Sequence, residues 1–353
     1  MKKDIFIVGT YSVLHFIIDM MCAIVMMALV SPLVSGSSSY VIVFILYNMF
    51  AFAFQLPFGI IADKLNKNAI VSAVGCIFVA MAFVFTKLPL LMCVLAGIGN
   101  ALFHVGGGVD VLNIANRKAS KPGIYVSTGA IGLFLGLKFA SFFITYKWIL
   151  VLILLISSVF LVYAYNKINK EFNVNNEKVK IEKVRGQVFV ILLCIFITIV
   201  MRSYLGFILN YEWKSNLALS ILFVCGVVLG KMLGGILGDK FGLKRVATVS
   251  LVLSAICLGF AFKSPILGIL GILLFNMTMP ITLIVASNTL YSSKGFAFGL
   301  TTLALFIGAT PSLLKISILP FNTTSVIIGV IVSSVIFYIG AHFYDKKLEK
   351  EKC

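Results

Sequence analysis

Long apolar stretches, separated by short segments that hold charged residues, Pro or Gly, follow one another along the whole chain. Each is close to the roughly 20 apolar residues that a helix needs to cross the hydrocarbon core of a bilayer. We therefore predict twelve transmembrane helices, at residues 5–33, 39–62, 69–86, 89–113, 122–145, 147–166, 187–211, 216–238, 246–262, 265–290, 295–314 and 323–343. The first stretch contains Asp19 and is too long for a cleavable signal peptide, so we expect it to be a retained span.

The composition agrees with this pattern. Of the 353 residues, 61% are hydrophobic and 12% are charged, and the mean hydropathy is +1.10. Soluble proteins carry about 25% charged residues, so an ordinary soluble enzyme is excluded. Six of the seven cysteines lie inside apolar stretches and no CxxC pair occurs, which favours small packed side chains over disulfides or metal ligands.

The basic residues indicate an orientation in the membrane. The chain has 29 Lys and Arg against 12 Asp and Glu. If both termini are cytoplasmic, 21 basic residues lie in inside segments, 5 lie in outside segments and three lie within spans. This bias follows the positive-inside rule, so the charge excess reflects topology and not nucleic-acid binding. The preference for Lys over Arg, with abundant Ile and Asn, suggests a bacterium with an AT-rich genome and hence its cytoplasmic membrane.

The two halves of the sequence repeat each other. Asp63 and Asp239 are 176 residues apart, and the same offset pairs Gly59 with Gly235, Lys64 with Lys240 and Asn100 with Asn276. Matches at one constant offset indicate an internal duplication, which is common in transporters. We predict an N-terminal six-helix half at 1–166, a cytoplasmic linker at 167–185 and a C-terminal six-helix half at 186–353.

The repeated segment resembles the signature loop of the major facilitator superfamily, Gly-x-x-x-Asp-Lys-x-Gly-x-Lys-Arg. The second copy is nearly complete, whereas the first has Asn66 where Gly is usual and Asn68 where a basic residue is usual. The resemblance implies an all-α membrane protein of two pseudo-symmetric six-helix bundles that acts as a monomeric transporter. Short motifs around His15, His104 and Arg202 are similar to those of the fosmidomycin-resistance branch.

The resemblance also implies a conformational latch. The loop aspartates are expected to meet the starts of helices in the opposite half, near Gly295 for Asp63 and near Gly123 for Asp239. Unpaired N–H groups and the helix dipole favour an anion at such a position. The alternative is that the loops only anchor the protein at the membrane surface. The latch residues would be Gly59, Asp63, Lys64, Gly235, Asp239, Lys240, Lys244 and Arg245.

Charged residues within predicted spans are candidates for function, because one at the bilayer centre costs at least about 2.5–3.5 kcal/mol. Three cations face one central carboxylate, Asp19, which favours an anionic substrate. Arg offers a planar fork that suits carboxylate or phosphate groups, so it is the expected anchor. The alternative is that Asp19 forms a structural ion pair with a cation and that the remaining lysines extend to the interface. The candidate substrate-binding residues are Arg202, Lys138, Lys231, His104, Asn100 and Asn276.

His15 and Asp19 are four residues apart and share one face of the first span. A histidine beside a carboxylate can exchange a proton near neutral pH, so this pair is the candidate proton-coupling site. The alternative is a buried histidine that makes one hydrogen bond. Asp110, near the cytoplasmic end of the fourth span, is expected to cap a helix or to pair with basic loop residues such as Arg117.

These features favour a transporter over the other classes of protein. HExxH, GxSxG, CxxC and P-loop motifs are absent from the sequence, so we expect no enzymatic activity, ATP hydrolysis, cofactor or metal. We expect a proton-coupled secondary transporter for a small organic anion, with protons and the lipid bilayer as its other partners. The alternatives are a proton-driven efflux pump for phosphonate-like toxic compounds and a receptor-like relative that binds without transport.

Overall fold

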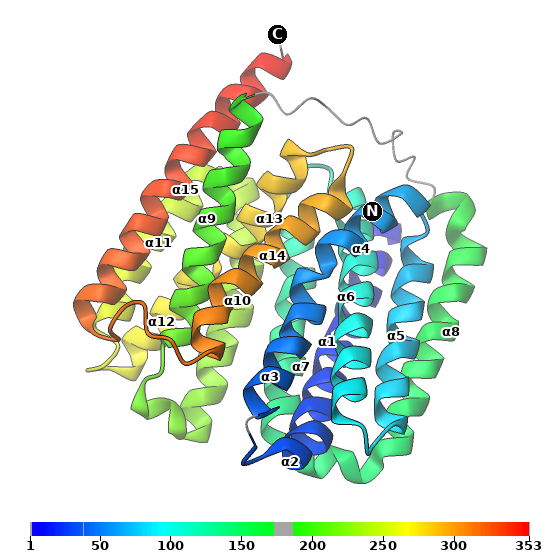
Figure 1. Ribbon diagram of the computed structural model, residues 1–353. Coiled ribbons are helices and arrows are strands. Elements are labelled where there is room, and N and C mark those ends of the chain that lie inside the picture. Colours follow the sequence, from blue (N-terminus) through cyan, green and yellow to red (C-terminus); the bar gives the residue numbers. More distant parts are fainter. Residues whose placement is uncertain (1, 38, 173–185, 353) are drawn as a thin grey trace. The chain divides into compact units, whose positions relative to one another are not determined.

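The computed structural model describes residues 2–37, 39–172 and 186–352, and every regular element in these ranges is a helix (Figure 1). The elements before the midpoint are α1 (Lys2–Ile24), η1 (Val25–Val30), α2 (Ser31–Val34), α3 (Ser39–Asn48), η2 (Met49–Ala53), α4 (Gln55–Leu65), α5 (Asn68–Val84), α6 (Pro89–Ile114), α7 (Ser120–Phe143), η3 (Ile144–Tyr146) and α8 (Lys147–Phe172). Those after it are α9 (Gly186–Ile208), η4 (Glu212–Ser215), α10 (Leu217–Phe241), α11 (Leu243–Gly259), α12 (Pro265–Asn276), α13 (Thr278–Thr289), α14 (Lys294–Leu313) and α15 (Thr323–Lys352).

These elements confirm the predicted twelve-helix architecture. Continuous stretches such as α1–η1–α2, α3–η2–α4 and α12–α13 each correspond to one predicted span. Nine stretches of the described residues are long and apolar enough to cross a membrane, and one of them, Ser120–Ala164, contains α7 and most of α8. Of the predicted linker 167–185, residues up to Phe172 continue α8, and residues 173–185 lie outside the described part.

By its internal contacts the chain divides into two compact units. The first unit is Met1–Ile114, Thr128–Val179 and Ser292–Leu303, and the second is Ala115–Ser127, Lys180–Tyr291 and Ala304–Cys353. The start of α7 therefore belongs to the second unit, and the start of α14 belongs to the first. The predicted halves at 1–166 and 186–353 stay a prediction.

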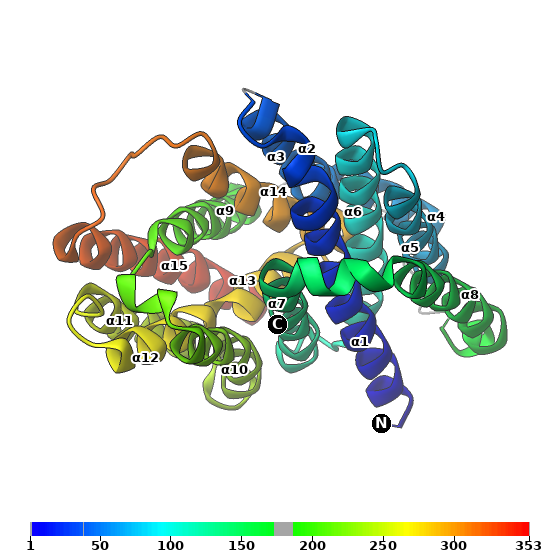
Figure 2. The same ribbon diagram turned by 90° about the horizontal axis from the view of Figure 1, so that it is seen from below.

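In the first unit, α5 lies between α6 and α8, as both ribbon views show (Figures 1 and 2). Small residues bring the helices close together. A Cβ at Gly75 would overlap the backbone of α6 at Gly99 and Phe103. On α7, a Cβ at Gly132 would overlap the carbonyl oxygen of Phe16 on α1. Close approach of backbones is the usual way in which membrane helices associate, because burial of apolar surface gives no driving force in lipid.

In the second unit, α15 packs against α9 and α11, and α10 packs against α12 (Figure 2). The helix pair α12–α13 is broken at Met277. Pro280 follows three residues later and has no N–H group, so the carbonyl of Asn276 loses its usual partner within the helix. Near this break the Thr278 hydroxyl donates to the Phe275 carbonyl over 2.8 Å.

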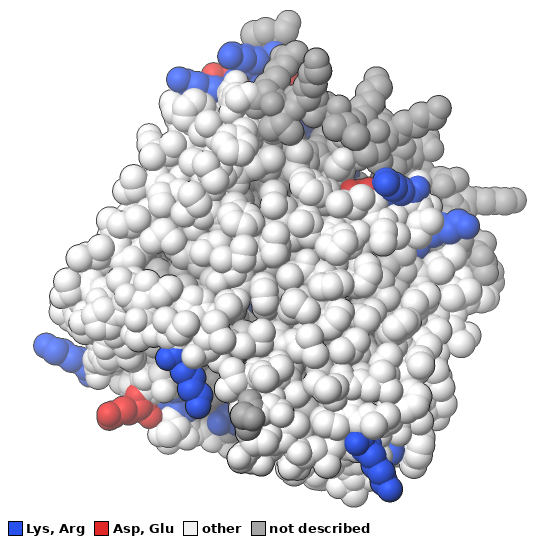
Figure 3. Space-filling model, viewed as in Figure 1, with Lys and Arg blue, Asp and Glu red and all other residues white. Residues whose placement is uncertain are grey.

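Apolar side chains dominate the outer surface of the protein. Exposed large hydrophobic residues include Ile5 on α1, Trp148 and Val159 on α8 and Ile266 on α12. Most of the face shown in Figure 3 carries neither acidic nor basic side chains. Such a surface suits lipid tails and not water, in agreement with a polytopic membrane protein.

The packing of α7 on α1 generates a first prediction. Gly132→Ala should destabilise the protein by about 1–3 kcal/mol, because the added methyl group has no space against the Phe16 carbonyl. Gly206→Ala on α9 is the matched control, since a Cβ there meets nothing within 4 Å. Alanine in a helix should stabilise that position by about 0.5–1 kcal/mol. Thermal unfolding of both variants in detergent measures the difference, and equal melting temperatures would contradict the packing.

Candidate functional site

A cluster of two histidines and one carboxylate lies inside the first unit. His15 and Asp19 come from α1, and His104 comes from α6. The two Nε2 atoms are 2.8 Å apart, and the Asp19 oxygens lie 3.2 Å from His15 Nε2 and 3.3 Å from His104 Nε2. Asn100 Nδ2 donates to Asp19 Oδ1 over 3.2 Å. We call His15, Asp19, Asn100 and His104 the His–Asp cluster.

Helical spacing explains why these side chains meet. His15 and Asp19 are four residues apart on α1, and Asn100 and His104 are four residues apart on α6, so each helix presents two polar groups on one face. Where α7 passes the cluster the residue is Gly129, and a Cβ there would overlap Asp19 Oδ2 and His15 Nε2. The absence of a side chain at this position leaves room for the cluster.

The hydrogen bonds restrict where protons sit in the cluster. His104 Nδ1 lies 2.8 Å from the carbonyl oxygen of Asn100, which can only accept, so Nδ1 carries the proton. His104 Nε2 then faces both His15 Nε2 and a carboxylate oxygen. At least one proton must lie among these three atoms, because lone pairs alone would repel one another. The geometry thus suits a site that holds and passes a proton.

The cluster is largely buried, so solvent screens its charges only weakly. The side chains of His15, His104 and Asp19 are 6%, 13% and 18% exposed. The ligand atoms of the three side chains lie within 4.8 Å of one another, which brings together the residue types that can share either a proton or a metal ion. In the described residues, Asp19 forms no ion pair with Lys138.

Arg202 on α9 is the buried cation of the second unit. Its residue is 6% exposed, its Nη2 donates to the Phe275 carbonyl over 3.2 Å, and its guanidinium lies 5.0 Å from the centre of the Phe275 ring. Within the described residues no carboxylate lies at ion-pair distance from it, and its buried Nε has no hydrogen-bond partner. A guanidinium has five N–H donors, so most of its hydrogen-bonding capacity is left for another group.

The other expected binding residues are distributed differently. His104 and Asn100 belong to the His–Asp cluster. Asn276 is the last residue of α12, and its side chain donates to the Ile272 carbonyl over 2.9 Å. It follows Phe275, whose carbonyl accepts from Arg202. Lys231 donates to the Val126 carbonyl over 3.1 Å, and Lys138 is exposed on α7.

Asp110 has different partners from those expected. Tyr11 donates to its Oδ2 over 2.6 Å and Asn68 donates to its Oδ1 over 2.8 Å, so the expected pairing with Arg117 is wrong. Arg117 instead pairs with Glu351 over 3.2 Å. Neutral donors on α1 and α5 therefore satisfy the Asp110 carboxylate inside the first unit.

The two signature aspartates bind the backbone at the starts of helices. Within the first unit, Asp63 accepts hydrogen bonds from the N–H groups of Gly295 and Phe296 over 2.7 and 2.9 Å. Within the second unit, Asp239 accepts from the N–H groups of Ala119 and Ser120 over 2.6 and 2.9 Å. The N–H groups bound by Asp239 lie before Gly123, the residue named from the sequence.

Glycines allow these close approaches. A Cβ at Gly59 would overlap the Gly295 carbonyl, and a Cβ at Gly235 would overlap the Ala119 carbonyl. The other loop residues named from the sequence take different positions. Lys244 pairs with Asp345 over 2.6 Å, Lys240 lies over the Phe241 ring, and Lys64 and Arg245 are exposed.

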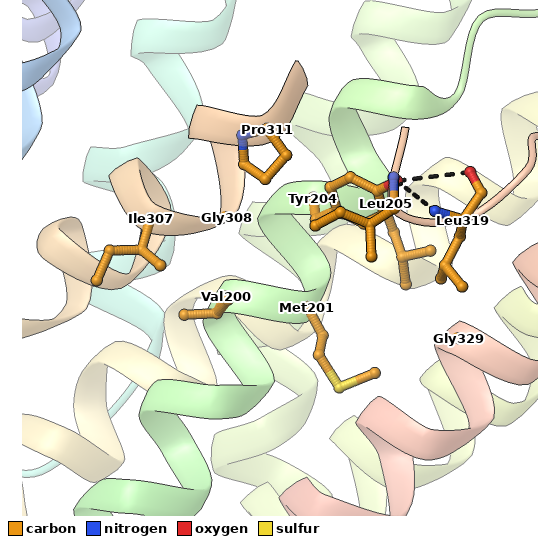
Figure 4. Close-up of a pocket in the computed structure, with 10 residues that line it drawn as sticks. Val200, Met201, Tyr204, Leu205, Ile307, Gly308, Pro311, Leu319 and Gly329 are labelled. Atoms are coloured by element: carbon orange, nitrogen blue, oxygen red, sulfur yellow. Dashed lines mark hydrogen bonds between the residues drawn. The ribbon is translucent and has the colours of Figure 1, made fainter. Parts of the chain in front are cut away.

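A cavity of about 320 Å³ lies in the second unit beside α9 (Figure 4). Its walls are almost wholly apolar, and its main polar group, the Tyr204 hydroxyl, accepts from the N–H groups of Ile318 and Leu319 over 2.9 and 2.8 Å. Arg202 is not among the lining residues, although Met201, Tyr204 and Leu205 are. The cavity is thus lined by neighbours of Arg202 on α9 and not by Arg202 itself.

The convergence of His104 on His15 and Asp19 was not predicted. The sequence pattern predicts His104 as a substrate-binding residue and only the α1 pair, His15 and Asp19, as the coupling site. The available signal was the second i, i+4 pair, Asn100 and His104, in the fourth span. Two such pairs of polar residues in two spans are an indication of a shared site, although sequence alone does not say that the two faces meet.

Comparisons with known proteins agree with this architecture. A sequence profile described as Major Facilitator Superfamily matches residues 11–313. The E. coli fucose:proton symporter FucP shares 12% identity and a TM-score of 0.65, over 97% of this chain and 99% of that chain. The human organic anion transporter MFSD10 (TETRAN) shares 12% identity and a TM-score of 0.69, over 97% of this chain and 99% of that chain. None of the curated proteins compared matches the chain.

The aspartate at the start of α14 generates a second prediction. Asp63→Asn should destabilise the protein by about 1.5–3 kcal/mol, because two charge-assisted hydrogen bonds to backbone N–H groups are weakened. The matched control is Asp345→Asn, which removes the partner of Lys244 at a site where Asp345 is 40% exposed. An exposed ion pair contributes about 0–1 kcal/mol. Thermal unfolding tests this difference, and equal shifts for the two variants would contradict it.

Proposed function

Because this chain belongs to the major facilitator superfamily, we propose that it is a proton-coupled secondary transporter that moves a small organic anion across the membrane by alternating access. The observation that supports an anionic solute is the state of Arg202, a buried guanidinium with no carboxylate partner in the described part of the chain. We further propose the bacterial cytoplasmic membrane, cytoplasmic termini and a monomer.

The partners of Arg202 support an anionic solute. A backbone carbonyl and an aromatic face stabilise the guanidinium without neutralising its charge. An unpaired buried charge is costly, and an entering anion would remove most of that cost. Arg also offers parallel N–H donors that match the two oxygens of a carboxylate or phosphonate. Asn276 follows the carbonyl that Arg202 binds, and its position makes it a candidate second contact.

The remaining expected binding residues support the proposal to different degrees. Lys231 already donates to a backbone carbonyl, and Lys138 is exposed, so neither has the isolation of Arg202. We therefore assign them auxiliary roles in attracting an anion. His104 and Asn100 contact each other and Asp19. Because Asp19 is the candidate coupling residue, we assign these two residues to proton coupling more than to substrate binding.

The His–Asp cluster supports proton coupling. The shared geometry of His15, His104 and Asp19 requires at least one proton, and the carboxylate of Asp19 is the most exposed group of the three. A carrier that couples two fluxes needs a site that releases its proton in one state of the cycle. We propose that Asp19 and His15 perform this step and that His104 stabilises the protonated form.

The signature loops support a latch. Backbone N–H groups at two helix starts donate hydrogen bonds to Asp63 and Asp239. The backbones come into close contact there because Gly59 and Gly235 carry no side chains. The four bonds are 2.6–2.9 Å long, which suits contacts that hold one conformation. We propose that these bonds form and break as the transporter alternates. The neighbouring basic residues Lys64, Lys240, Lys244 and Arg245 would hold the loops at the membrane surface.

A second candidate is proton-driven efflux of a phosphonate-like toxic compound. It needs the same anchor, because the guanidinium fork suits phosphonate oxygens as well as carboxylate oxygens. Substrate chemistry therefore distinguishes the two functions, and a panel that contains both classes of anion separates them. A receptor-like relative would bind the anion and would not move it.

The third prediction concerns binding. In a thermal-shift panel of acetate, benzoate, methylphosphonate and tetraphenylphosphonium, at least one anion should stabilise the purified protein and the lipophilic cation should not. A ligand at 100 times its dissociation constant adds about 2.7 kcal/mol to the native state. Arg202→Gln should abolish the shift and Arg202→Lys should reduce it, because the ammonium group retains the charge without the fork.

Arg117→Gln is the matched control for this test. Arg117 is 50% exposed and pairs with Glu351, so its removal should leave the anion-induced shift unchanged. If tetraphenylphosphonium stabilised the protein and no anion did, the substrate would be cationic. If an anion still stabilised the Arg202→Gln variant, another residue would be the anchor of the anion.

The fourth prediction concerns coupling. In proteoliposomes, a pH gradient should drive accumulation of the anion that gives the largest thermal shift, and an ionophore that collapses the gradient should abolish it. Asp19→Asn should lose gradient-driven accumulation at least tenfold while retaining exchange of labelled for unlabelled anion, because binding persists without the titrating carboxylate. His15→Gln should show a weaker form of the same defect.

The control for coupling is Asp345→Asn, which removes a carboxylate at 40% exposure far along the chain from the cluster. It should accumulate the anion like the wild type. If Asp19→Asn also accumulated it normally, Asp19 would not be the coupling group. Loss of both accumulation and exchange would instead indicate a defect in substrate binding.

A further inference from the structure

We propose that His15, Asp19 and His104 form a binding site for one divalent transition-metal ion of the zinc type. The proposal rests on the arrangement of three ligand atoms inside the first unit: two imidazole Nε2 atoms and one carboxylate oxygen. It concerns binding only, so it holds or fails independently of what the protein transports.

The distances fit such an ion. Zinc binds imidazole nitrogen and carboxylate oxygen at about 2.0–2.2 Å, which places ligand atoms about 3.3 Å apart in tetrahedral geometry. Asp19 Oδ2 lies 3.2 Å from His15 Nε2 and Asp19 Oδ1 lies 3.3 Å from His104 Nε2, so the carboxylate faces both nitrogens with a different oxygen toward each. Rotation of the carboxylate would bring one oxygen to the ion, within the 4.8 Å that encloses the three ligand atoms. The Nε2 atoms themselves are 2.8 Å apart, so the two rings need to separate by only about 0.5 Å to admit the ion.

The surroundings orient two of the three ligands. The Nδ1–H group of His104 donates to the Asn100 carbonyl over 2.8 Å, which leaves Nε2 free of its tautomeric proton and directed at the cluster. Metal-binding histidines usually carry such an outer hydrogen bond. The Asn100 side chain donates to Asp19 over 3.2 Å and so fixes the carboxylate. Asn100 therefore supports one histidine through its backbone and the aspartate through its amide.

The donor set also defines the class of metal. Two imidazoles and one carboxylate suit zinc, cobalt and nickel, whereas magnesium and calcium prefer sites made of oxygen ligands. Three protein ligands leave at least one coordination position for water or a solute. Access for that ligand is consistent with the partial exposure of Asp19 and His104, at 18% and 13%.

The binding is tested with the metal alone. Purified protein without a polyhistidine tag is titrated with Co²⁺, whose visible absorption reports tetrahedral nitrogen and oxygen ligands, and Zn²⁺ is then added to displace it. We expect one Co²⁺ per chain, full displacement by Zn²⁺ and none by Mg²⁺. His15→Ala and His104→Ala should each lose the absorption band, and Asp19→Asn should weaken binding.

Two further variants separate the ligands from their support and from the rest of the chain. Asn100→Ala should weaken Co²⁺ binding by about 10–100-fold without abolishing it, as loss of an outer hydrogen bond does in other metal sites. His342→Ala is the matched control, because His342 is the third histidine of the chain and belongs to α15, outside the cluster. Its titration should match that of the wild type.

Any of three results would overturn the proposal: a wild-type protein without the cobalt band, a band that persists in both His15→Ala and His104→Ala, or displacement of Co²⁺ by Mg²⁺ as effective as by Zn²⁺. Thermal unfolding without metal shows whether each variant folds. If the alanine variants fail to fold, His15→Gln and His104→Gln replace them, because glutamine keeps a polar group of similar size without the imidazole nitrogen.

Discussion

The fold depends on satisfying the backbone N–H groups at the starts of two helices. The first N–H groups of a helix have no partner within it, so each needs an acceptor from elsewhere in the chain or from water. Asp63 accepts from Gly295 and Phe296, and Asp239 accepts from Ala119 and Ser120. Donors and acceptors are both related by the offset of 176 residues, so the repeat extends to the bonds themselves. These bonds explain why each helix start groups with the unit that contains its aspartate.

The repeat is broken where the candidate chemistry lies. At the offset of 176 residues, the cluster residues His15, Asp19 and His104 correspond to Ile191, Ile195 and Pro280, and Arg202 corresponds to Met26. The first unit therefore has two histidines and a carboxylate where the second has apolar side chains and a helix break. The second unit has the buried Arg202 where the first has the thioether of Met26. The duplicated architecture thus carries different polar groups in its two copies.

Much of the architecture could be predicted from the sequence, because apolar length and charge bias act locally along the chain. The predicted span at 89–113 and the helix α6 (Pro89–Ile114) differ by one residue. The partners of polar groups could not be predicted in the same way, since they depend on how helices rotate against one another. Asp110 binds Tyr11 and Asn68 because α1 and α5 face it, and Lys138 is exposed because Gly132 and Gly136 turn the other face of α7 toward α1.

In the proposed function, the charge of Arg202 is neutralised by a solute anion. The most direct measurement is an experimental structure of the protein in a lipid nanodisc with methylphosphonate or benzoate, at a resolution that shows side chains. We expect density for the anion within hydrogen-bond distance of the guanidinium, with the bond to the Phe275 carbonyl retained. A carboxylate of the chain paired with Arg202 in that structure, with the anion bound elsewhere or absent, would contradict it.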